Sequence, residues 1–459
     1  MLRRFCKSLV RVITTTFFRR IDVVGAENIP ANGPVIFAGN HPNALMDGWL
    51  IAARCGRWPL HFMVNAKLWK FPGLGALLDA SGAVPVYPRA EHGTDADNSK
   101  AFEKLYEVIE AGHCMGVFPE GVSHTESHLM ALKTGTARIA LDVADRGKQH
   151  VLIVPCGLNY IHRHRFRSQV MLEFGQPIVV DEIWAKRFRE DPERAVRELT
   201  DELAESLKSV TLNAPDWNTL RFAQTSRRLY KPASAALSPA EYVDLSRRFI
   251  DGYVDDDPEV QAFRADAENY QARLDMLGLK DYQLRGDMSL ADVSRKVAVR
   301  TLWMLVLLPL AIPGALLHLP VGWIAATVGE RFSYEMDDVA TLKVFSTMLL
   351  LPLMYFGAAL MVGLFFGGGW GLLALLVLIV SFFSTVRVIE AQASLLSSVV
   401  SFLRLARLRH EIAELRDVRA DLVQRIRALV DRLADPEMER MFVASDFAAP
   451  PSSEAGGGQ

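Results

Sequence analysis

The sequence predicts an α/β fold, a mixed sheet flanked by helices, followed by helical and apolar segments. Two observations carry this prediction. Short apolar runs alternate with helical patterns from residue 21 to residue 180, and long apolar stretches lie between residues 301 and 386. Alternating strands and helices are typical of a sheet covered by helices. Apolar stretches of roughly 20 residues are long enough to cross a bilayer.

Length and composition limit the number of domains and the kinds of partner to be expected. A chain of 459 residues has room for two or three domains. Its formal net charge of −2 gives no electrostatic case for a nucleic-acid partner. Four cysteines are scattered without a CxxC pair, which argues against a zinc site or a disulfide framework and fits a reducing compartment.

The α/β domain is predicted at residues 21–180. Strands are expected where apolar residues run together, at 35–39, 61–65, 83–87, 115–118, 151–154 and 170–174. Helices are expected at 45–54, 99–111 and 133–144. Sites in such sheets lie just beyond the carboxyl ends of strands, and both His41 and Glu120 fall there.

Helical segments are predicted on both sides of this domain. Residues 1–20 place basic side chains among apolar ones, which predicts an amphipathic helix on an anionic membrane surface, with an ordinary surface helix as the alternative. Residues 181–295 are predicted to form a helical module because apolar residues recur at helical spacing among charges.

Membrane segments are predicted at residues 301–386. The stretch 344–386 favours a helical hairpin that turns at the glycines 367–369. The stretch 301–327 is broken by prolines, and it is expected either to dip in and return at Pro313-Gly314 or to cross once. Basic residues flank both ends of the region, so the positive-inside rule favours the first alternative, with both ends in the cytoplasm.

A long helix is predicted at residues 388–435. Its apolar residues follow a 4-3 rhythm with Arg419 at one of the positions. That spacing predicts either a coiled-coil homodimer or packing on another part of the same chain. Residues 448–459 are expected to be disordered.

His41 and Asp47 are the candidate catalytic pair. A neutral imidazole can take the proton of a hydroxyl as that oxygen attacks an acyl carbonyl. A carboxylate on the other ring nitrogen would fix the tautomer and stabilise the imidazolium. No serine or cysteine nucleophile with a suitable elbow is visible, so direct attack by a substrate alcohol is expected. The alternative is a strand-end histidine with a local structural bond.

Four ordered segments resemble the signature blocks of the glycerolipid acyltransferases, over roughly residues 20–230. Asn40-His41-Pro42-Asn43 with Asp47 resembles the first block, with five intervening residues where four are commoner. Residues 82–89, 118–124 and 154–160 resemble the second, third and fourth, and Ser123 stands where the third block commonly has arginine. The longer spacing and the Ser-His pair are similar to the branch of yeast-type glycerol-3-phosphate and dihydroxyacetone-phosphate acyltransferases and their bacterial relatives.

The resemblance implies a membrane-bound O-acyltransferase. It would move a fatty acyl group from acyl-CoA or acyl-carrier protein to glycerol 3-phosphate, or to dihydroxyacetone phosphate, with no metal or organic cofactor. Arg89 would bind the phosphate as a planar, permanently charged fork. The other acceptor-binding candidates are Glu120, Gly121, Lys133, Asn43 and Ser123.

Other interpretations stay open at this point. The acceptor could instead be lysophosphatidate, or the chain could be an inactive membrane scaffold; a transporter is disfavoured because the apolar spans contain almost no ionisable residues. His124 and His128 are interpreted as loop histidines, and the basic run 163–167 is expected to face phosphate headgroups or a thioester carrier. The catalytic domain is expected on the cytoplasmic face of a bacterial inner membrane, with the endoplasmic reticulum as the alternative.

Overall fold

The computed structural model describes residues 2–70, 74–87, 99–146, 150–232, 235, 237–253, 256–277, 279, 281, 284, 290–333, 335–407, 409–433 and 441–442. The chain divides into two compact units. Unit 1 comprises Met1–Asp216, Ser238–Val243 and Ala326–Phe345, and unit 2 comprises Trp217–Leu237, Asp244–Ala325 and Ser346–Gln459. The segment 181–295, predicted as one module, contributes helices to both units.

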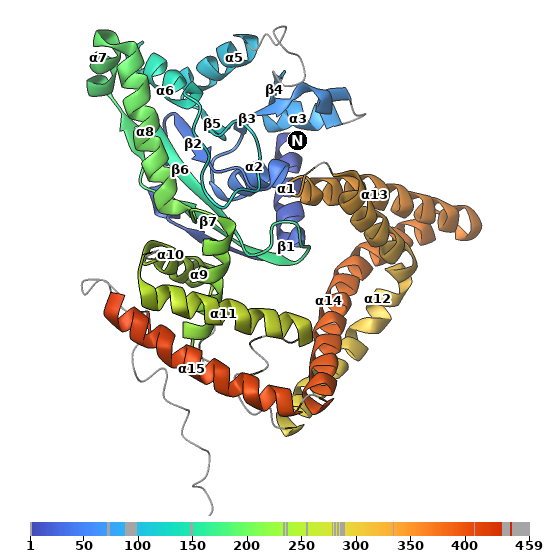
Figure 1. Ribbon diagram of the computed structural model, residues 1–459. Helices are drawn as coiled ribbons and strands as arrows, with labels where there is room; N and C mark the ends of the chain where they lie inside the picture. Colours follow the sequence, from blue (N-terminus) through green and yellow to red (C-terminus); the bar gives the residue numbers. More distant parts are fainter. Residues whose placement is uncertain are drawn as a thin grey trace, which may run out of the picture. The chain divides into compact units, whose positions relative to one another are not determined.

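Unit 1 is built on a mixed eight-stranded sheet, which confirms the predicted α/β fold (Figure 1). The strand order is β1-β7-β6-β2-β5-β3-β4, and β8 pairs with β6. The pairings of β7 and β8 with β6 are antiparallel, and the other pairings are parallel. The strands are β1 (Phe18–Val24), β2 (Val35–Gly39), β3 (Leu60–Asn65), β4 (Val84–Val86), β5 (Cys114–Val117), β6 (Val151–Tyr160), β7 (Ser168–Phe174) and β8 (Ile178–Val180).

All six predicted strands are present, and two further strands were not predicted. β8 is short and β1 lies partly in the stretch expected to be helical. The N-terminal helix α1 (Leu2–Phe17) ends before Arg19 and Arg20, because Phe18 already begins β1 and is buried beside β7. The pairing of β1 with β7 therefore overrides the helical pattern of the last residues of the stretch.

Alternation along the strands gives the sheet two buried faces. Ile36 and Ala38 of β2 contribute to a core formed with α5 (Ser99–Glu110), α6 (Gly135–Asp145), α7 (Glu182–Glu190) and α8 (Pro192–Val210). On the opposite face, an added Cβ at Gly39 would lie 3.2 Å from Ile51 Cδ1 of α2 (Ala44–Arg54). Packing on both faces fixes the strand ends that carry the candidate site.

The helix α1 packs against α2 and α3 (Leu74–Ser81) through one face. Cys6, Val10 and Thr14 are buried on that face, whereas Leu2, Phe5 and the basic residues of the helix are exposed. The exposed face fits the predicted membrane-surface helix, which stays a prediction.

Unit 2 contains a helical core that includes the predicted tail helix. In this core, α15 (Arg409–Leu433) packs on α9 (Trp217–Tyr230) and α11 (Pro258–Leu277). Apolar side chains of α10 (Pro239–Asp251) also belong to the core. The apolar positions of α15 that are buried here are Ile412, Leu415, Leu422, Ile426 and Leu429. Arg419, at the irregular position of the apolar rhythm, lies 2.9 Å from the Asp281 carboxylate. These contacts support packing of the tail within one chain.

Within the described residues, three helices are long and apolar enough to cross a membrane, judged by length and composition. The candidate spans are Ala298–Phe332 in α12 (Leu290–Phe332), Val339–Phe366, which is α13, and Gly368–Gln392 in α14 (Gly368–Arg407). The predicted reversal at Pro313-Gly314 is absent, since α12 continues through Pro309, Pro313 and Pro320. The backbone N–H of Gly314 donates to the Ser381 hydroxyl at 2.9 Å, and such side-chain bonds let a membrane helix tolerate proline.

The predicted hairpin between α13 and α14 turns at Gly367, whose φ of +99° favours glycine. Next to this turn the two backbones approach closely, because an added Cβ at Gly371 would lie 2.6 Å from the Ala359 carbonyl oxygen. Small residues permit this kind of contact between membrane helices.

A buried polar cluster joins α12, α13 and α14 in unit 2. His318 Nε2 lies 2.7 Å from the Tyr355 hydroxyl, and His318 Nδ1 lies 3.0 Å from the Thr385 hydroxyl. Tyr355 also donates to the Leu378 carbonyl oxygen at 3.1 Å. Each ring nitrogen of His318 therefore has a hydroxyl partner on a different helix.

Candidate active site

The strand ends that carry the candidate residues are neighbours in the sheet. β2 pairs in parallel with β5 on one side and with β6 on the other. His41 follows β2 and Glu120 follows β5, and the carboxyl ends of parallel strands meet at one edge. Asn40 continues the pairing toward β6, since its Oδ1 accepts the Leu158 N–H at 2.7 Å and its amide donates to the Leu158 carbonyl at 3.2 Å.

The predicted contact between His41 and Asp47 is present. His41 Nδ1 lies 2.9 Å from Asp47 Oδ2, which also accepts the Asn43 N–H at 2.7 Å. Asp47 lies in the first turn of α2 with its side chain fully buried. The longer loop between the pair includes Ala44 with a φ of +40°, which is uncommon for a residue with a side chain. The carboxylate favours a proton on Nδ1, so that Nε2 carries the lone pair.

A stack of aromatic rings holds the imidazole of His41. Its ring lies 3.9 Å from the Phe118 ring, centroid to centroid, with an interplanar angle of 4°. Phe118 in turn stacks on Phe62 at 5.6 Å. Gly116 makes room for Phe62, because an added Cβ there would lie 2.1 Å from that ring. Nε2 has no hydrogen-bond partner among the residues that the structure describes, and the side chain is 18% exposed.

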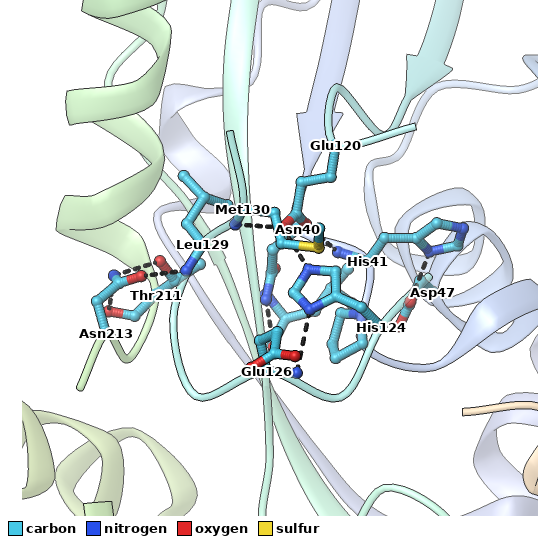
Figure 2. Close-up of polar contacts among 12 residues, drawn as sticks. Asn40, His41, Asp47, Glu120, His124, Glu126, Leu129, Met130, Thr211 and Asn213 are labelled. Atoms are coloured by element: carbon cyan, nitrogen blue, oxygen red, sulfur yellow. Dashed lines mark hydrogen bonds and ion pairs between the residues drawn. The ribbon is translucent and has the colours of Figure 1, made fainter. Parts of the chain in front are cut away.

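Glu120 connects three parts of the site (Figure 2). Its Oε1 accepts the His41 backbone N–H at 2.8 Å, and its Oε2 accepts the Met130 N–H at 2.8 Å. The same Oε2 contacts His124 Nε2. The side chain is fully buried, and the structure therefore gives Glu120 a positioning role around the His41 loop. Its predicted contact with the acceptor stays a prediction.

Gly121 and Lys133 lie together beside Glu120. Gly121 has a φ of +79°, and an added Cβ there would lie 2.3 Å from Lys133 Nζ. The backbone N–H of Lys133 donates to the Pro119 carbonyl oxygen at 2.7 Å. The lysine side chain therefore crosses the turn after β5, where it could add positive charge for an anionic acceptor. Ser123 is half-buried in the same loop.

Of the two remaining predicted acceptor-binding residues, the structure describes Asn43 and does not describe Arg89. Asn43 is fully buried, and its amide donates to the Arg163 carbonyl oxygen at 3.0 Å, which ties the His41 loop to the segment after β6. Asn43 Oδ1 is buried without a partner among the described residues. Arg89 lies outside the described residues, so its predicted contact with phosphate remains a prediction.

Tyr160, at the end of β6, is a site residue that the sequence did not single out. Its hydroxyl donates to Asp47 Oδ1 at 2.5 Å. Burial raises the pKa of the Asp47 carboxyl, and the hydrogen bonds from His41, Tyr160 and Asn43 oppose that rise. Burial and the neighbouring Asp47 raise the pKa of Tyr160 well above its ordinary value. The phenol therefore stays protonated and can act as a hydrogen-bond donor at any working pH.

Arg163 and His124 also belong to the site, in roles that were not predicted. Arg163 Nη1 donates to the carbonyl oxygens of Pro42 and His124, each at 3.2 Å. The guanidinium therefore braces the His41 loop and the loop after β5. That the basic run 163–167 faces phosphate headgroups or a thioester carrier stays a prediction. His124 pairs with Glu120, and this hydrogen bond raises the pKa of His124. Its spacing of four residues from Glu120 was the signal available in the sequence.

The arrangement suits proton transfer at His41 Nε2. No described residue hydrogen-bonds this nitrogen, the opposite nitrogen is held by a carboxylate, and the ring stacks on Phe118. No group of three or more histidine, cysteine or acidic side chains positioned to hold a metal ion occurs within the described ranges.

Two family models match separate regions of the chain. The Acyltransferase family model matches residues 20–159, and the Glycerol-3-phosphate acyltransferase 2 C-terminal domain model matches residues 222–439. Glycerol-3-phosphate O-acyltransferase 2 of Saccharomyces cerevisiae is 34% identical to this chain over 280 residues. Glycerol-3-phosphate O-acyltransferase 1 of the same yeast is 32% identical over 283 residues. These regions cover 56% and 58% of this chain, and the chain spans 37% of the length of each yeast protein.

Two bacterial proteins match a smaller part of the chain. The 1-acyl-sn-glycerol-3-phosphate acyltransferase of Borreliella burgdorferi is 32% identical over 157 residues, which are 32% of this chain and 60% of that protein. The crystal structure of the 1-acyl-sn-glycerophosphate acyltransferase of Thermotoga maritima is 23% identical, covers 45% of this chain and 82% of that one, and superposes with a TM-score of 0.32. Residues 20–159 are therefore similar to the Acyltransferase family, residues 222–439 are similar to the C-terminal domain of glycerol-3-phosphate acyltransferase 2, and 56–58% of the chain is similar to the two yeast glycerol-3-phosphate O-acyltransferases.

Proposed function

We propose that this chain transfers a fatty acyl group from an acyl thioester to glycerol 3-phosphate, or to dihydroxyacetone phosphate, in phospholipid synthesis. The observation that supports it best is the open Nε2 of His41 beside an acyltransferase-type third block, with Asp47 2.9 Å from Nδ1. The donor is acyl-CoA or acyl-carrier protein. The names and similarity of the yeast relatives favour this acceptor.

The proposed reaction needs no covalent enzyme intermediate. His41 Nε2 takes the proton of the acceptor hydroxyl while that oxygen attacks the thioester carbonyl. Asp47 stabilises the imidazolium that results. The tetrahedral intermediate then collapses, the carbon–sulfur bond breaks, and the leaving thiolate takes the proton from Nε2. The products are an ester and a free thiol, and His41 returns to its neutral state.

The phosphate of the acceptor is proposed to bind positive charge at the same edge of the sheet. Lys133 crosses Gly121 there, and Arg89 of the second block is the predicted second cation. Both charges would fix the acceptor so that its hydroxyl reaches His41, which is the main task of substrate-positioning groups. Ser123 and Asn43 are the further predicted contacts.

Lysophosphatidate is the second candidate acceptor. One specific observation favours it, because the Borreliella protein of that printed activity matches 157 residues of this chain. Both acceptors carry a phosphate and a free glycerol hydroxyl, so the His41 chemistry is the same for both. An inactive scaffold is the remaining alternative.

The proposed enzyme works at a membrane. The three apolar helices would anchor it, the exposed basic face of α1 would lie on an anionic cytoplasmic surface, and the lipid product could enter the same leaflet. The bacterial inner membrane is the proposed location. A homodimer through the tail is less favoured, because α15 already buries its apolar positions against α9 and α11.

The test is acyl transfer in detergent or vesicles, with glycerol 3-phosphate and lysophosphatidate offered separately with palmitoyl-CoA. Wild type is compared with His41→Ala, and His128→Ala serves as a control because His128 is exposed in the loop that follows. Product from glycerol 3-phosphate, lost by about 10²-fold or more in His41→Ala only, supports the proposal. Product from lysophosphatidate alone would replace the acceptor, and activity that survives His41→Ala would overturn the mechanism.

A further inference from the structure

The two oxygens of the Asp47 carboxylate have different partners. Oδ2 accepts from His41 Nδ1 at 2.9 Å and from the Asn43 N–H at 2.7 Å. Oδ1 accepts from the Tyr160 hydroxyl at 2.5 Å. Within the described part of the chain, Tyr160 is the one hydrogen-bond donor to Oδ1. The tyrosine comes from a strand end 113 positions away in the sequence.

Tyr160 is needed because Asp47 is buried. The side chain of Asp47 has no exposed surface, so water cannot solvate its negative charge. An ionised carboxylate in such a place is stable only when hydrogen bonds and nearby positive charge replace the lost water. The groups that face it are His41, Tyr160, the Asn43 N–H and the Arg163 guanidinium.

Tyr160 is itself held in place independently of any substrate. It ends β6, which is paired with β2 and β7, and its ring packs on Phe18 with 5.6 Å between centroids. The hydroxyl therefore points at Asp47 without help from flexible loops.

We propose that Tyr160 is a positioning residue for the reaction: it holds Oδ1 of Asp47, keeps that carboxylate ionised and oriented, and so supports His41 as the base. The inference deepens the proposed function and rests on it for its kinetic test. It predicts that removal of one oxygen atom, in Tyr160→Phe, weakens catalysis without weakening substrate binding.

The kinetic test compares Tyr160→Phe with wild type in acyl transfer from palmitoyl-CoA. We expect kcat to fall by about 10- to 100-fold, the range known for outer partners that orient metal-bound histidines, while KM for both substrates is unchanged. The matched control is Tyr106→Phe, because Tyr106 of α5 also hydrogen-bonds an aspartate, Asp142 of α6, but outside the candidate site. This control is expected to leave kcat unchanged.

Two measurements separate positioning from packing. Without the tyrosine donor, one of the hydrogen bonds that oppose the raised pKa of the Asp47 carboxyl is gone, so this carboxyl takes up a proton more readily and His41 loses its negative neighbour. Activity is therefore expected to fall more steeply toward acid pH in Tyr160→Phe than in wild type. The state of His41 is followed without any substrate, from the rate at which diethylpyrocarbonate modifies it, measured by mass spectrometry. Slower modification in Tyr160→Phe, with Tyr106→Phe like wild type, supports the proposal.

The outcomes that would overturn the inference are equally specific. Unchanged kcat in Tyr160→Phe would do so, and so would an equal loss of kcat at every pH with an unchanged rate of His41 modification, because lost packing alone predicts that result. If wild type acylates neither acceptor, the proposed function fails instead. The rate of diethylpyrocarbonate modification of His41 still decides the inference in that case, because it needs no turnover.

Discussion

Two histidines of this chain show how hydrogen bonding separates a reactive imidazole from a structural one. His41 has one ring nitrogen held by Asp47, while no described residue hydrogen-bonds the other. His318, in the apolar helices, has a hydroxyl partner on each nitrogen and is buried. An imidazole with a free lone pair can accept a substrate proton. An imidazole whose two nitrogens are both hydrogen-bonded would first have to break one of these bonds. The surroundings, more than the residue type, assign the role.

Removal of His41 should give the largest effect on chemistry. His41→Ala is expected to lower kcat by about 10²-fold or more, because the general base is lost. The thermal midpoint should also fall, since the variant removes the His41 partner of the buried Asp47 carboxylate and the ring that stacks on Phe118, so kcat is measured on the folded fraction. Comparable losses of kcat in His41→Ala and His318→Ala would break the comparison.

Removal of His318 should instead act on stability. His318→Ala removes two interhelical hydrogen bonds, worth about 0.6 kcal/mol each in membrane helices, and leaves a cavity, for a total of about 1–3 kcal/mol. Thermal unfolding in detergent should show the lower midpoint, while kcat of the folded fraction is unchanged. Leu316→Ala is the matched control, because Leu316 lies on the same helix and is 85% exposed.

Glu120→Gln tests the hydrogen bonds that position the His41 backbone and leaves the His41 imidazole unchanged. Glu120 accepts hydrogen bonds from His41 N–H, Met130 N–H and His124. A glutamine has one oxygen acceptor, so a buried donor loses its partner, at a cost of about 1–3 kcal/mol. We expect a lower thermal midpoint and a kcat reduced by about 10-fold, if roughly 1.4 kcal/mol of this cost falls on the transition state. Glu126→Gln, in the same loop but exposed, should leave both values unchanged.

The smallest expected effect concerns the pH dependence of the Glu120–His124 pair. The hydrogen bond to Glu120 raises the pKa of His124 above its ordinary value. A raised folded-state pKa contributes stability that is fully present below the unfolded-state pKa and is lost as pH rises through the folded value. The thermal midpoints of wild type and His124→Gln should therefore differ most at acid pH and converge as the pH rises above neutrality. A difference that grows with pH would contradict the assignment.

Much of unit 1 could be predicted from the sequence, because its strands are short apolar runs with clear breaks. The edge strand β1 was missed, since Phe18-Arg-Arg continues a helical pattern and only the pairing with β7 makes it a strand. In unit 2, the expected reversal at Pro313-Gly314 failed for a related reason. A hydroxyl from α14 satisfies the backbone there, and no local signal reveals a partner 67 residues away.

The candidate site shows the same limit. The His41–Asp47 contact could be predicted, because both residues belong to one local loop. Tyr160, Arg163 and the Phe62 ring could not, since they reach the site through sheet neighbours far apart in the sequence. The dependence of Glu120 on His124 was available in the spacing, but an isolated pair of loop histidines gave no reason to choose it.

The glycine at position 116 has a consequence for how related sequences diverge. Its missing side chain leaves the space that Phe62 fills, and the rings of Phe62 and Phe118 transmit that placement to the imidazole of His41. The two positions must therefore change together. A relative with alanine at 116 is expected to carry a smaller residue at 62, and chains that change only one of the two should be rare among active enzymes. Covariation of positions 62 and 116 in related sequences would then indicate that the histidine at the edge of the sheet still acts as a base.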